Sequence, residues 1–202
     1  NKGIEIKFNH AVIKANGYKK VKSATIGELS DDKSGYKNTK NIDCDCICVS
    51  GFWTPSVHLS SQSGNKLKFN KEIDAFIPDK SKQNEISVGS ANGDFTLKKT
   101  LYTGFKAGNE VSKRINNKDI DIQVPTTTEK DYKDHDKFWC SPLPKNIKVK
   151  RFVDFQNDVS VSDIEIAIRE GYRSIEHVKR YTTLGMATDQ GRTSNLNGLQ
   201  LV

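Results

Sequence analysis

The first part of the chain carries the alternating hydrophobic pattern of β-strands. Apolar and polar residues alternate over residues 4–8, and the Asn16-Gly17 pair is typical of a tight hairpin turn. Residues 18–29 and 42–49 continue the two-residue period on either side of a polar stretch that reads as a loop. The pattern therefore predicts a three-stranded meander, and a further strand pair is predicted over residues 66–77.

A buried strand, a glycine turn and a helix are predicted next. Residues 86–94 contain the strand and the turn, and apolar residues recur at helical spacing over residues 95–105. A helix that begins after such a turn presents free backbone N–H groups and its positive dipole end, which favour a phosphate. An ordinary strand–turn–helix joint explains the pattern equally well. The G-x-G-x-x-G fingerprint is absent, so a complete dinucleotide-binding fold is not predicted.

The end of the chain is predicted to be helical. Residues 123–150 contain three prolines and mixed charge, which is typical of a linker. Ser162 and Glu165 have the spacing of a capping box, which predicts a helix that Gly171 ends. Ser174 is expected to cap a second helix, followed by a polar loop rich in Thr, Gly and Asn. A module of this size needs a partner surface or a ligand to be stable.

Charge and hydropathy narrow the function classes. The 202 residues include 32 Lys plus Arg and 25 Asp plus Glu, for a net charge of +7. The lysines are scattered among asparagines and acidic residues, which favours a solvated surface over a nucleic-acid-binding groove. No apolar run is long enough to cross a membrane, and the sequence shows no signal segment. We therefore expect a cytoplasmic protein that binds neither membrane nor nucleic acid.

Three of the four cysteines alternate along the chain. Cys44, Cys46 and Cys48 would lie on one face of a strand, where a tetrahedral zinc site or mutual disulfides are hard to build. Their apolar neighbours favour packing as small buried hydrophobes. Reduced thiols, with Cys140 as the fourth, are consistent with a cytoplasmic location.

Several strings of residues resemble one protein family. Residues 152–159 (FVDFQNDV) and 179–195 (KRYTTLGMATDQGRTSN) resemble the alpha subunit of bacterial heterotetrameric sarcosine oxidase in order and spacing. Residues 50–62 (SGFWTPSVHLSSQ) resemble the end of its nucleotide-binding region, and residues 89–108 resemble the closing helix. The resemblance covers the middle of that subunit, between an N-terminal Rossmann fingerprint and a C-terminal folate-binding domain.

The resemblance implies an α/β fold with three parts. Residues 1–122 would be the C-terminal part of an FAD/NAD(P)-binding region of the two-dinucleotide type with a β-meander, and residues 123–150 a linker. Residues 151–202 would form a small helical module at the subunit interface, similar to bacterioferritin-associated ferredoxins. In those ferredoxins four cysteines hold a two-iron cluster, and the matching positions here are Asp154, Gln156, Asp189 and Ser194. Because such clusters need thiolate ligands, the resemblance implies a module without a cluster and without a metal.

The resemblance also implies an oxidoreductase that works in a complex. In the family, FAD on the beta subunit oxidises sarcosine, and electrons pass to FMN between the alpha and beta subunits, where oxygen becomes peroxide. Glycine and a one-carbon unit captured by tetrahydrofolate are the other products, and gamma and delta subunits complete the heterotetramer. Because the amine-oxidising flavin lies on another chain, we expect these 202 residues alone to be inactive.

Two sets of cofactor-binding residues follow from the resemblance, and no catalytic acid or base does. The FMN contacts would be Lys179, Arg180, Thr182, Thr183, Thr188, Gln190 and Thr193. The NAD contacts would be Gly89, Ser90, Gly93, Phe95 and Leu97. Trp53 and His58 are interpreted as packing residues, because a Trp-Thr-Pro turn and a lone histidine between apolar neighbours are more often structural.

Two alternatives remain open at this point. One is the alpha subunit of a related complex, such as proline dehydrogenase, opine oxidase or hydrogen cyanide synthase. The absent cysteines count against members that keep an iron–sulfur cluster. The other is a basic binding protein with no redox role, which salt-dependent nucleic-acid binding would reveal.

Overall fold

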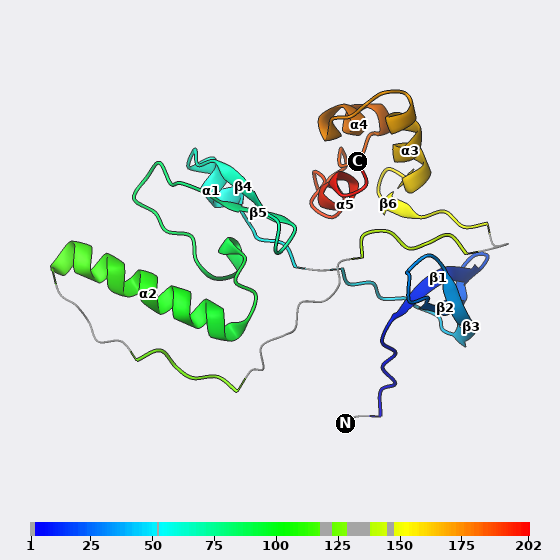
Figure 1. The fold of residues 1–202 in the computed structure, drawn as a ribbon, viewed down its shortest axis with the longest axis horizontal. Helices are drawn as coiled ribbons and strands as arrows, with labels where there is room; N and C mark the ends of the chain where they lie inside the picture. The colour runs from blue at the N-terminus through cyan, green and yellow to red at the C-terminus, as the bar shows by residue number, and fades with distance from the viewer. Residues whose placement is uncertain (1–2, 52, 118–122, 129–137, 145–147) are drawn as a thin grey trace. The chain divides into compact units, whose positions relative to one another are not determined.

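The computed structural model describes residues 3–51, 53–117, 123–128, 138–144 and 148–202 (Figure 1). They fall into two compact units, one formed by residues 1–49 and 136–202 and the other by residues 50–135. Helices and strands are mixed in both units, as the sequence predicted. None of the helices described is long and apolar enough to cross a membrane. Parts of the predicted linker, residues 129–137 and 145–147, lie outside the described residues.

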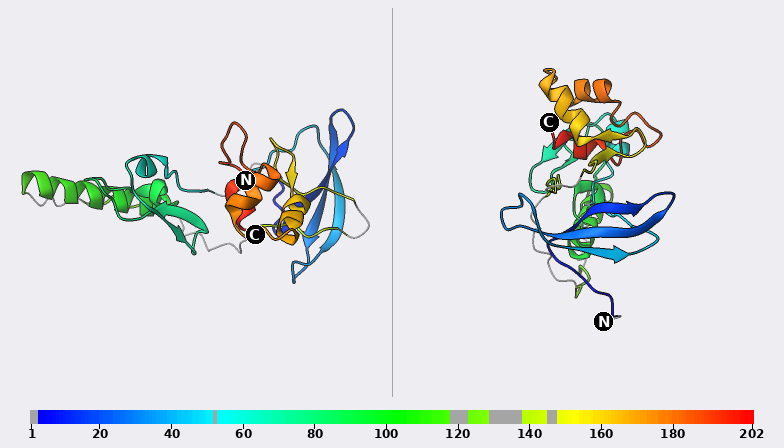
Figure 2. Two further views of the ribbon diagram at one scale, coloured as in Figure 1. Left: turned by 90° about the horizontal axis from the view of Figure 1, so that it is seen from above. Right: turned by 90° about the vertical axis from the view of Figure 1, so that its right-hand side faces the viewer.

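The first unit opens with the predicted three-stranded meander. Strands β1 (His10–Gly17), β2 (Val21–Leu29) and β3 (Tyr36–Asp43) pair antiparallel in sequence order and lie side by side (Figure 2). The β1–β2 turn follows the Asn-Gly pair, and Gly17 pairs with Val21. A Cβ on Gly17 would lie 2.0 Å from the carbonyl oxygen of Lys20, so this turn requires glycine.

Two strand boundaries were wrong. The third strand occupies residues 36–43 instead of 42–49, because β2 pairs Leu29 with Tyr36 and Ser23 with Asp43. All residues of β3 after the first are exposed, so this strand carries no hydrophobic alternation. Residues 4–8, predicted as a strand, are exposed and form no strand.

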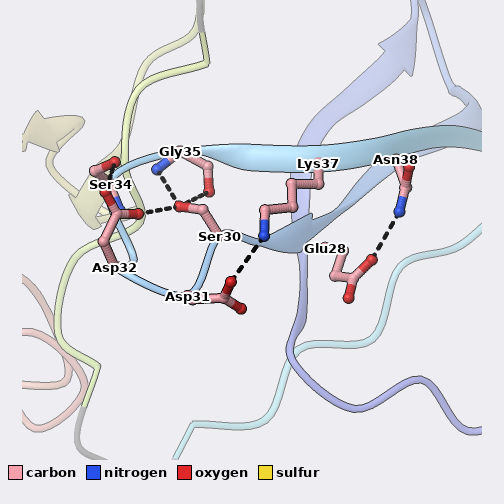
Figure 3. Close-up of polar contacts among 8 residues, drawn as sticks. All are labelled: Glu28, Ser30, Asp31, Asp32, Ser34, Gly35, Lys37 and Asn38. Carbon is pink, nitrogen blue, oxygen red and sulfur yellow. Dashed lines mark hydrogen bonds and ion pairs between the residues drawn. The ribbon is translucent and has the colours of Figure 1, made fainter.

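Polar side chains close the turn between β2 and β3 (Figure 3). The Ser30 hydroxyl donates to Asp32 Oδ1 at 2.6 Å, and the Ser34 hydroxyl donates to Asp32 Oδ2 at 2.6 Å. These bonds hold the pKa of Asp32 well below its usual range. Lys37 Nζ lies 3.0 Å from Asp31 Oδ2, which raises the pKa of the lysine.

The cysteine prediction was also wrong. Cys44 is half-buried, but Cys46 and Cys48 are exposed and lie beyond the end of β3. The three thiols do not pack on one strand face because β3 ends at Asp43, before all three cysteines. Cys140 is half-buried and packs against the core of the C-terminal module.

The second unit contains a short helix and the second predicted strand pair. Helix α1 (His58–Gln62) precedes β4 (Leu67–Asn70) and β5 (Ala75–Pro78), which pair antiparallel. Phe69 and Phe76 face each other across the pair with ring centroids 5.3 Å apart in an edge-on arrangement. The prediction of a strand pair over residues 66–77 is confirmed.

A short 3-10 turn and a long helix follow. The strand expected before the glycines does not form, since residues 86–88 belong to no strand. The turn η1 (Gly89–Asn92) occupies the predicted glycine turn, and helix α2 (Leu97–Asn116) covers most of the predicted helical spacing. The backbone of Lys99 donates to the N-cap hydroxyl of Thr96 at 3.3 Å. The helix ends at a left-handed Asn117.

The C-terminal module is a small hairpin with three helices around one core (Figure 1). Its elements are β6 (Phe152–Asp154), β7 (Val159–Ser160), α3 (Val161–Arg169), α4 (Ile175–Thr182) and α5 (Asn195–Leu199). The buried apolar residues are Val153, Val159, Val161, Ile164, Ala167, Val178 and Leu184. Both predicted helices are present, and Gly171 follows the first with a left-handed φ of 99°.

The capping box of α3 lies two residues earlier than predicted. Ser160 is the N-cap, its hydroxyl lies 2.7 Å from Asp163 Oδ2, and its backbone N–H donates to the same oxygen at 2.8 Å. Ser162 and Glu165 are exposed residues inside the helix. The Ser160 hydroxyl lowers the pKa of Asp163, since it stabilises the carboxylate form. The extended φ and ψ of Ser160 place the helix start here.

Candidate functional site

A buried carboxylate organises one end of the C-terminal module. Asp154 ends β6 and is 2% exposed. Its Oδ1 accepts from the backbone N–H groups of Gln156 at 2.9 Å and Asn157 at 3.2 Å. Its Oδ2 accepts from the backbone N–H of Gly185 at 2.8 Å and from the Ser194 hydroxyl at 3.4 Å. The carboxylate therefore joins the β6–β7 turn to residues 183–194, which we call the glycine loop.

A second layer of hydrogen bonds holds the same two segments together. The Thr188 hydroxyl donates to Gln156 Oε1 at 2.7 Å, and Asn157 Nδ2 donates to the carbonyl of Thr183 at 2.9 Å. Within the loop, Asp189 accepts from the Thr193 hydroxyl at 2.6 Å. This bond, helped by backbone N–H groups and the Gln156 side chain, lowers the pKa of Asp189.

The four positions matched to cluster ligands thus lie in one polar network. Asp154 and Ser194 are in direct contact, and Gln156 interacts with Asp189. Their side chains carry carboxylate, hydroxyl and amide groups instead of thiolates. Among the described residues, no group of three or more His, Cys, Asp or Glu side chains is arranged to hold a metal ion.

Two glycines shape the loop around one asparagine. Gly185 and Gly191 have φ values of 68° and 77°, in the left-handed region. A Cβ on Gly185 would lie 1.9 Å from Asn195 Oδ1, and one on Gly191 would lie 2.2 Å from Asn195 Nδ2. Both positions therefore require glycine for conformation and for space. Sequence reasoning missed Asn195 and Asn157, because an asparagine gives no signal of which distant backbone it will contact.

The residues predicted to bind FMN lie at the end of α4 and in the glycine loop. Lys179 Nζ is 4.0 Å from Glu176, whereas the exposed Arg180 makes no hydrogen bond or ion pair with any residue that the structure describes. Gln190 is exposed, with a left-handed φ of 50°. A cation and an amide are therefore open to an approaching ligand.

The hydroxyl groups of the four threonines in this set all donate hydrogen bonds within the module. Thr182 donates to the carbonyl of Val178 at 2.7 Å, and Thr183 donates to the carbonyl of Thr182 at 2.5 Å. Thr188 and Thr193 donate to Gln156 and Asp189, as described above. Each hydroxyl keeps lone pairs but would have to rotate before it could donate to a phosphate.

A hollow of 390 Å³ lies beside this set. Its lining residues are Asn157, Asp158, Val159, Asp163, Ile166, Tyr181 and Thr182. Only Thr182 belongs to the predicted FMN set, and the two carboxylates repel a phosphate. The hollow is therefore not the place where we expect a phosphate to bind.

The residues predicted to bind NAD lie in the second unit. Gly89 and Ser90 belong to η1, and Gly93 follows it. Phe95 precedes the N-cap of α2, and Leu97 is the first residue of that helix. Gly93 has a φ of 89°, and a Cβ there would lie 2.7 Å from Ile73 Cδ1, so the turn is tight.

One acidic residue in this turn was missed. Asp94 Oδ2 is buried without a hydrogen-bond partner among the described residues. Nearby, the Thr100 hydroxyl donates to the carbonyl of Asp94 at 2.8 Å and fixes the turn against α2. Asp94 Oδ2 is therefore an unsatisfied acceptor inside this turn.

Trp53 and His58 are exposed and are not packed into the part of the chain that the structure describes. The Trp53 side chain is 80% exposed, and His58 is exposed at the start of α1. Their interpretation as packing residues was wrong, because the buried residue of the Trp-Thr-Pro turn is Pro55.

The chain is thus a mixture of helices and strands. It contains a small helical module, in which the buried side chain of Asp154 holds a polar loop. Residues 148–202 match the model of the sarcosine oxidase A3 domain family, and most of the chain matches a segment of sarcosine oxidase alpha subunits. The family resemblance inferred from residues 152–159 and 179–195 is confirmed.

Three relatives carry this match. The alpha subunit from Rhizobium meliloti (strain 1021) is 34% identical over 165 residues, which cover 81% of this chain and 16% of the relative. Those from Corynebacterium sp. strains P-1 and U-96 are 30% and 29% identical, cover 93% and 89% of this chain, and are themselves covered to 20% and 19%. The chain thus spans a fifth or less of the length of these relatives.

Among solved structures, the chain is similar to L-proline dehydrogenase from P. horikoshii. The identity is 18% and the TM-score 0.49, with 94% of this chain and 38% of the other covered.

Proposed function

We propose that this chain is part of the alpha subunit of a sarcosine oxidase. The assembled enzyme would oxidatively demethylate sarcosine to glycine, release peroxide and transfer a one-carbon unit to tetrahydrofolate, with beta, gamma and delta subunits as partners. The observation that carries the proposal is that the C-terminal module and the region before it both match the same type of subunit. No residue of this chain is assigned a catalytic role.

In this proposal the chain has the three parts expected from the resemblance. Residues 1–122 complete an FAD/NAD(P)-binding region of the two-dinucleotide type, residues 123–150 link it onward, and residues 151–202 form a ferredoxin-like module at a subunit interface. The absence of a cluster is supported by the donor set, since Asp154, Gln156, Asp189 and Ser194 supply no thiolate. The oxygen atoms of Asp154, Gln156 and Asp189 instead accept hydrogen bonds that shape the glycine loop, and the Ser194 hydroxyl donates to Asp154.

The FMN site is assigned to the end of α4 and the glycine loop. Arg180 is the group best suited to the phosphate, because it is exposed and has no partner among the described residues. Lys179 adds positive charge, Gln190 offers an amide to a polar ring edge, and Thr182, Thr183, Thr188 and Thr193 offer hydroxyl groups. FMN, when bound, supplies a flavin that receives electrons and passes them to oxygen. The chain's own part is to bind and orient this group.

The NAD site is assigned to the turn formed by Gly89, Ser90 and Gly93, with Phe95 and Leu97 beside it. Asp94 Oδ2, which is buried without a hydrogen-bond partner among the described residues, lies in the same turn. This chain's residues would hold the nucleotide, and no chemical step is assigned to them.

The test is flavin content and sarcosine turnover of the complete complex. We would express the full-length subunit with its partners, replace Arg180 by Ala, and measure FMN released by denaturation. Arg173→Ala is the matched control, since Arg173 is also an exposed arginine of the module outside the proposed site. We expect FMN retention to fall for Arg180→Ala only, and sarcosine-dependent peroxide release by the unaltered complex.

The two parts of the proposal fail separately. Equal FMN content in the Arg180 and Arg173 variants would refute the assigned FMN site without affecting the enzyme class. A flavin-loaded complex that releases no peroxide with sarcosine would refute the enzyme class.

A further inference from the structure

Three closely spaced cysteines differ in how the backbone holds them. The backbone N–H of Cys44 donates to the carbonyl of Lys22 at 3.1 Å, which ties this residue to β2. Neither Cys46 nor Cys48 makes a ladder bond, and both side chains are exposed. Their Sγ atoms lie 3.9 Å apart. The pair thus stands just beyond the end of the sheet, on backbone that no strand partner constrains.

The separation of the two sulfur atoms is informative. A disulfide needs an S–S distance of about 2 Å and Cβ atoms about 4 Å apart. In a regular strand, residues two apart are separated by about 6.6 Å along the chain, which prevents such closure. The Cys46 and Cys48 sulfur atoms are already in contact, so the loop has to close them by about 2 Å only.

The two sulfur atoms share one hydrogen bond, in which either thiol can be the donor. This bond with Cys48 raises the pKa of Cys46, and a negative charge on Cys48 acts in the same direction. A thiolate formed on one sulfur therefore has the S–H group of the other cysteine only 3.9 Å away. This arrangement gives the pair one nucleophilic thiolate and one resolving thiol.

We propose that Cys46 and Cys48 form a dithiol that hydrogen peroxide oxidises to an intramolecular disulfide. The thiolate of one of the two cysteines attacks one peroxide oxygen, the O–O bond breaks, and the departing hydroxide takes a proton to become water. The thiol of the other cysteine then attacks the resulting sulfenic sulfur, the S–O bond breaks, and a second water leaves. Two thiols lose two electrons and two protons, and one peroxide becomes two water molecules. The oxidant is added in the test, so this proposal does not rest on the proposed enzyme activity.

The experiment counts free thiols in the full-length protein after peroxide treatment. Trypsin releases residues 41–66 as one peptide that contains all three cysteines, because no Lys or Arg lies between Lys40 and Lys66. Before oxidation, iodoacetamide should label three cysteines on this peptide. After oxidation, iodoacetamide should label Cys44 alone. The peptide should then weigh two hydrogen atoms less than a reduced peptide that carries one label. Treatment with dithiothreitol should restore all three labels.

Serine variants locate the bond. Cys48→Ser and Cys46→Ser should each abolish the disulfide, whereas Cys44→Ser should leave it intact. Circular dichroism of each variant checks that the fold is retained. Persistent labelling of all three cysteines after peroxide, a bond that includes Cys44, or a disulfide between two protein molecules on a non-reducing gel would each overturn the proposal.

Discussion

Replacing Asp154 by Asn tests the role of the buried carboxylate most directly. The substitution keeps the size of the side chain but turns one acceptor oxygen into a donor NH₂ group. In either amide orientation at least one backbone N–H now faces a donor: Gly185 on one side, or Gln156 and Asn157 on the other. The glycine loop should therefore loosen first.

The expected cost follows from the number of bonds affected. A buried N–H left without an acceptor costs about 1–3 kcal/mol. Loss of the negative charge weakens the remaining hydrogen bonds, since charge-assisted bonds are roughly twice as strong as neutral ones. Together these terms predict that the module loses about 2–4 kcal/mol of stability.

Hydrogen exchange provides the local readout that a chain with two units needs, because a single global unfolding transition cannot be assumed. Peptides from the glycine loop should exchange faster in Asp154→Asn, whereas the β1–β2 hairpin should be unchanged. Asp158→Asn is the matched control: it removes a charge from the same hairpin turn at an exposed, left-handed position that asparagine tolerates. Equal protection of the loop in both variants would refute the reasoning.

Two further predictions concern the same loop. Gly191→Ala should destabilise the module by about 1–3 kcal/mol in chemical denaturation, because the new Cβ meets Asn195 and the backbone has a left-handed φ. Gly108→Ala is the control, because Gly108 lies in a helix with open space around it. This variant should be neutral or stabilising in the same denaturation series. Because the pKa of Asp189 is depressed in the folded protein, its contribution to stability is present above the unfolded pKa, about 3.9, and is lost as the pH falls through the folded value. Loop protection measured against pH should show this loss in the unaltered protein and not in Asp189→Asn, and identical pH profiles would contradict it.

Short sequence patterns predicted those elements of the fold that depend on neighbouring residues. The Asn16-Gly17 turn was correct because a hairpin of this kind depends on two adjacent residues. The predicted position of the third strand was wrong because the residues of β3 face water on both sides. Pairing with β2, and not hydrophobic alternation, therefore determines where β3 lies. The capping box of α3 was predicted at the wrong serine because Ser160 and Ser162 both have an acidic residue three positions later.

The polar network of the C-terminal module could not be derived from periodicity. Ser194 reaches Asp154 across 40 residues of sequence, and no pattern in the chain encodes that contact. Resemblance to a family selected the right positions, since it carries information about which residues converge. The exposure of Cys46 and Cys48 was missed for a similar reason: their alternation is that of a strand, but the strand partner ends first.

The hydrogen bond from Gly185 to Asp154 joins residues 31 positions apart, which affects the order in which the parts of the module assemble. The loop cannot take its shape until the hairpin and both helices between them are in place, so it should be the last part to assemble. By the same logic, any movement of the glycine loop breaks bonds that also hold the hairpin turn. The mobility of the loop and the local cohesion of the module are therefore governed by one set of contacts.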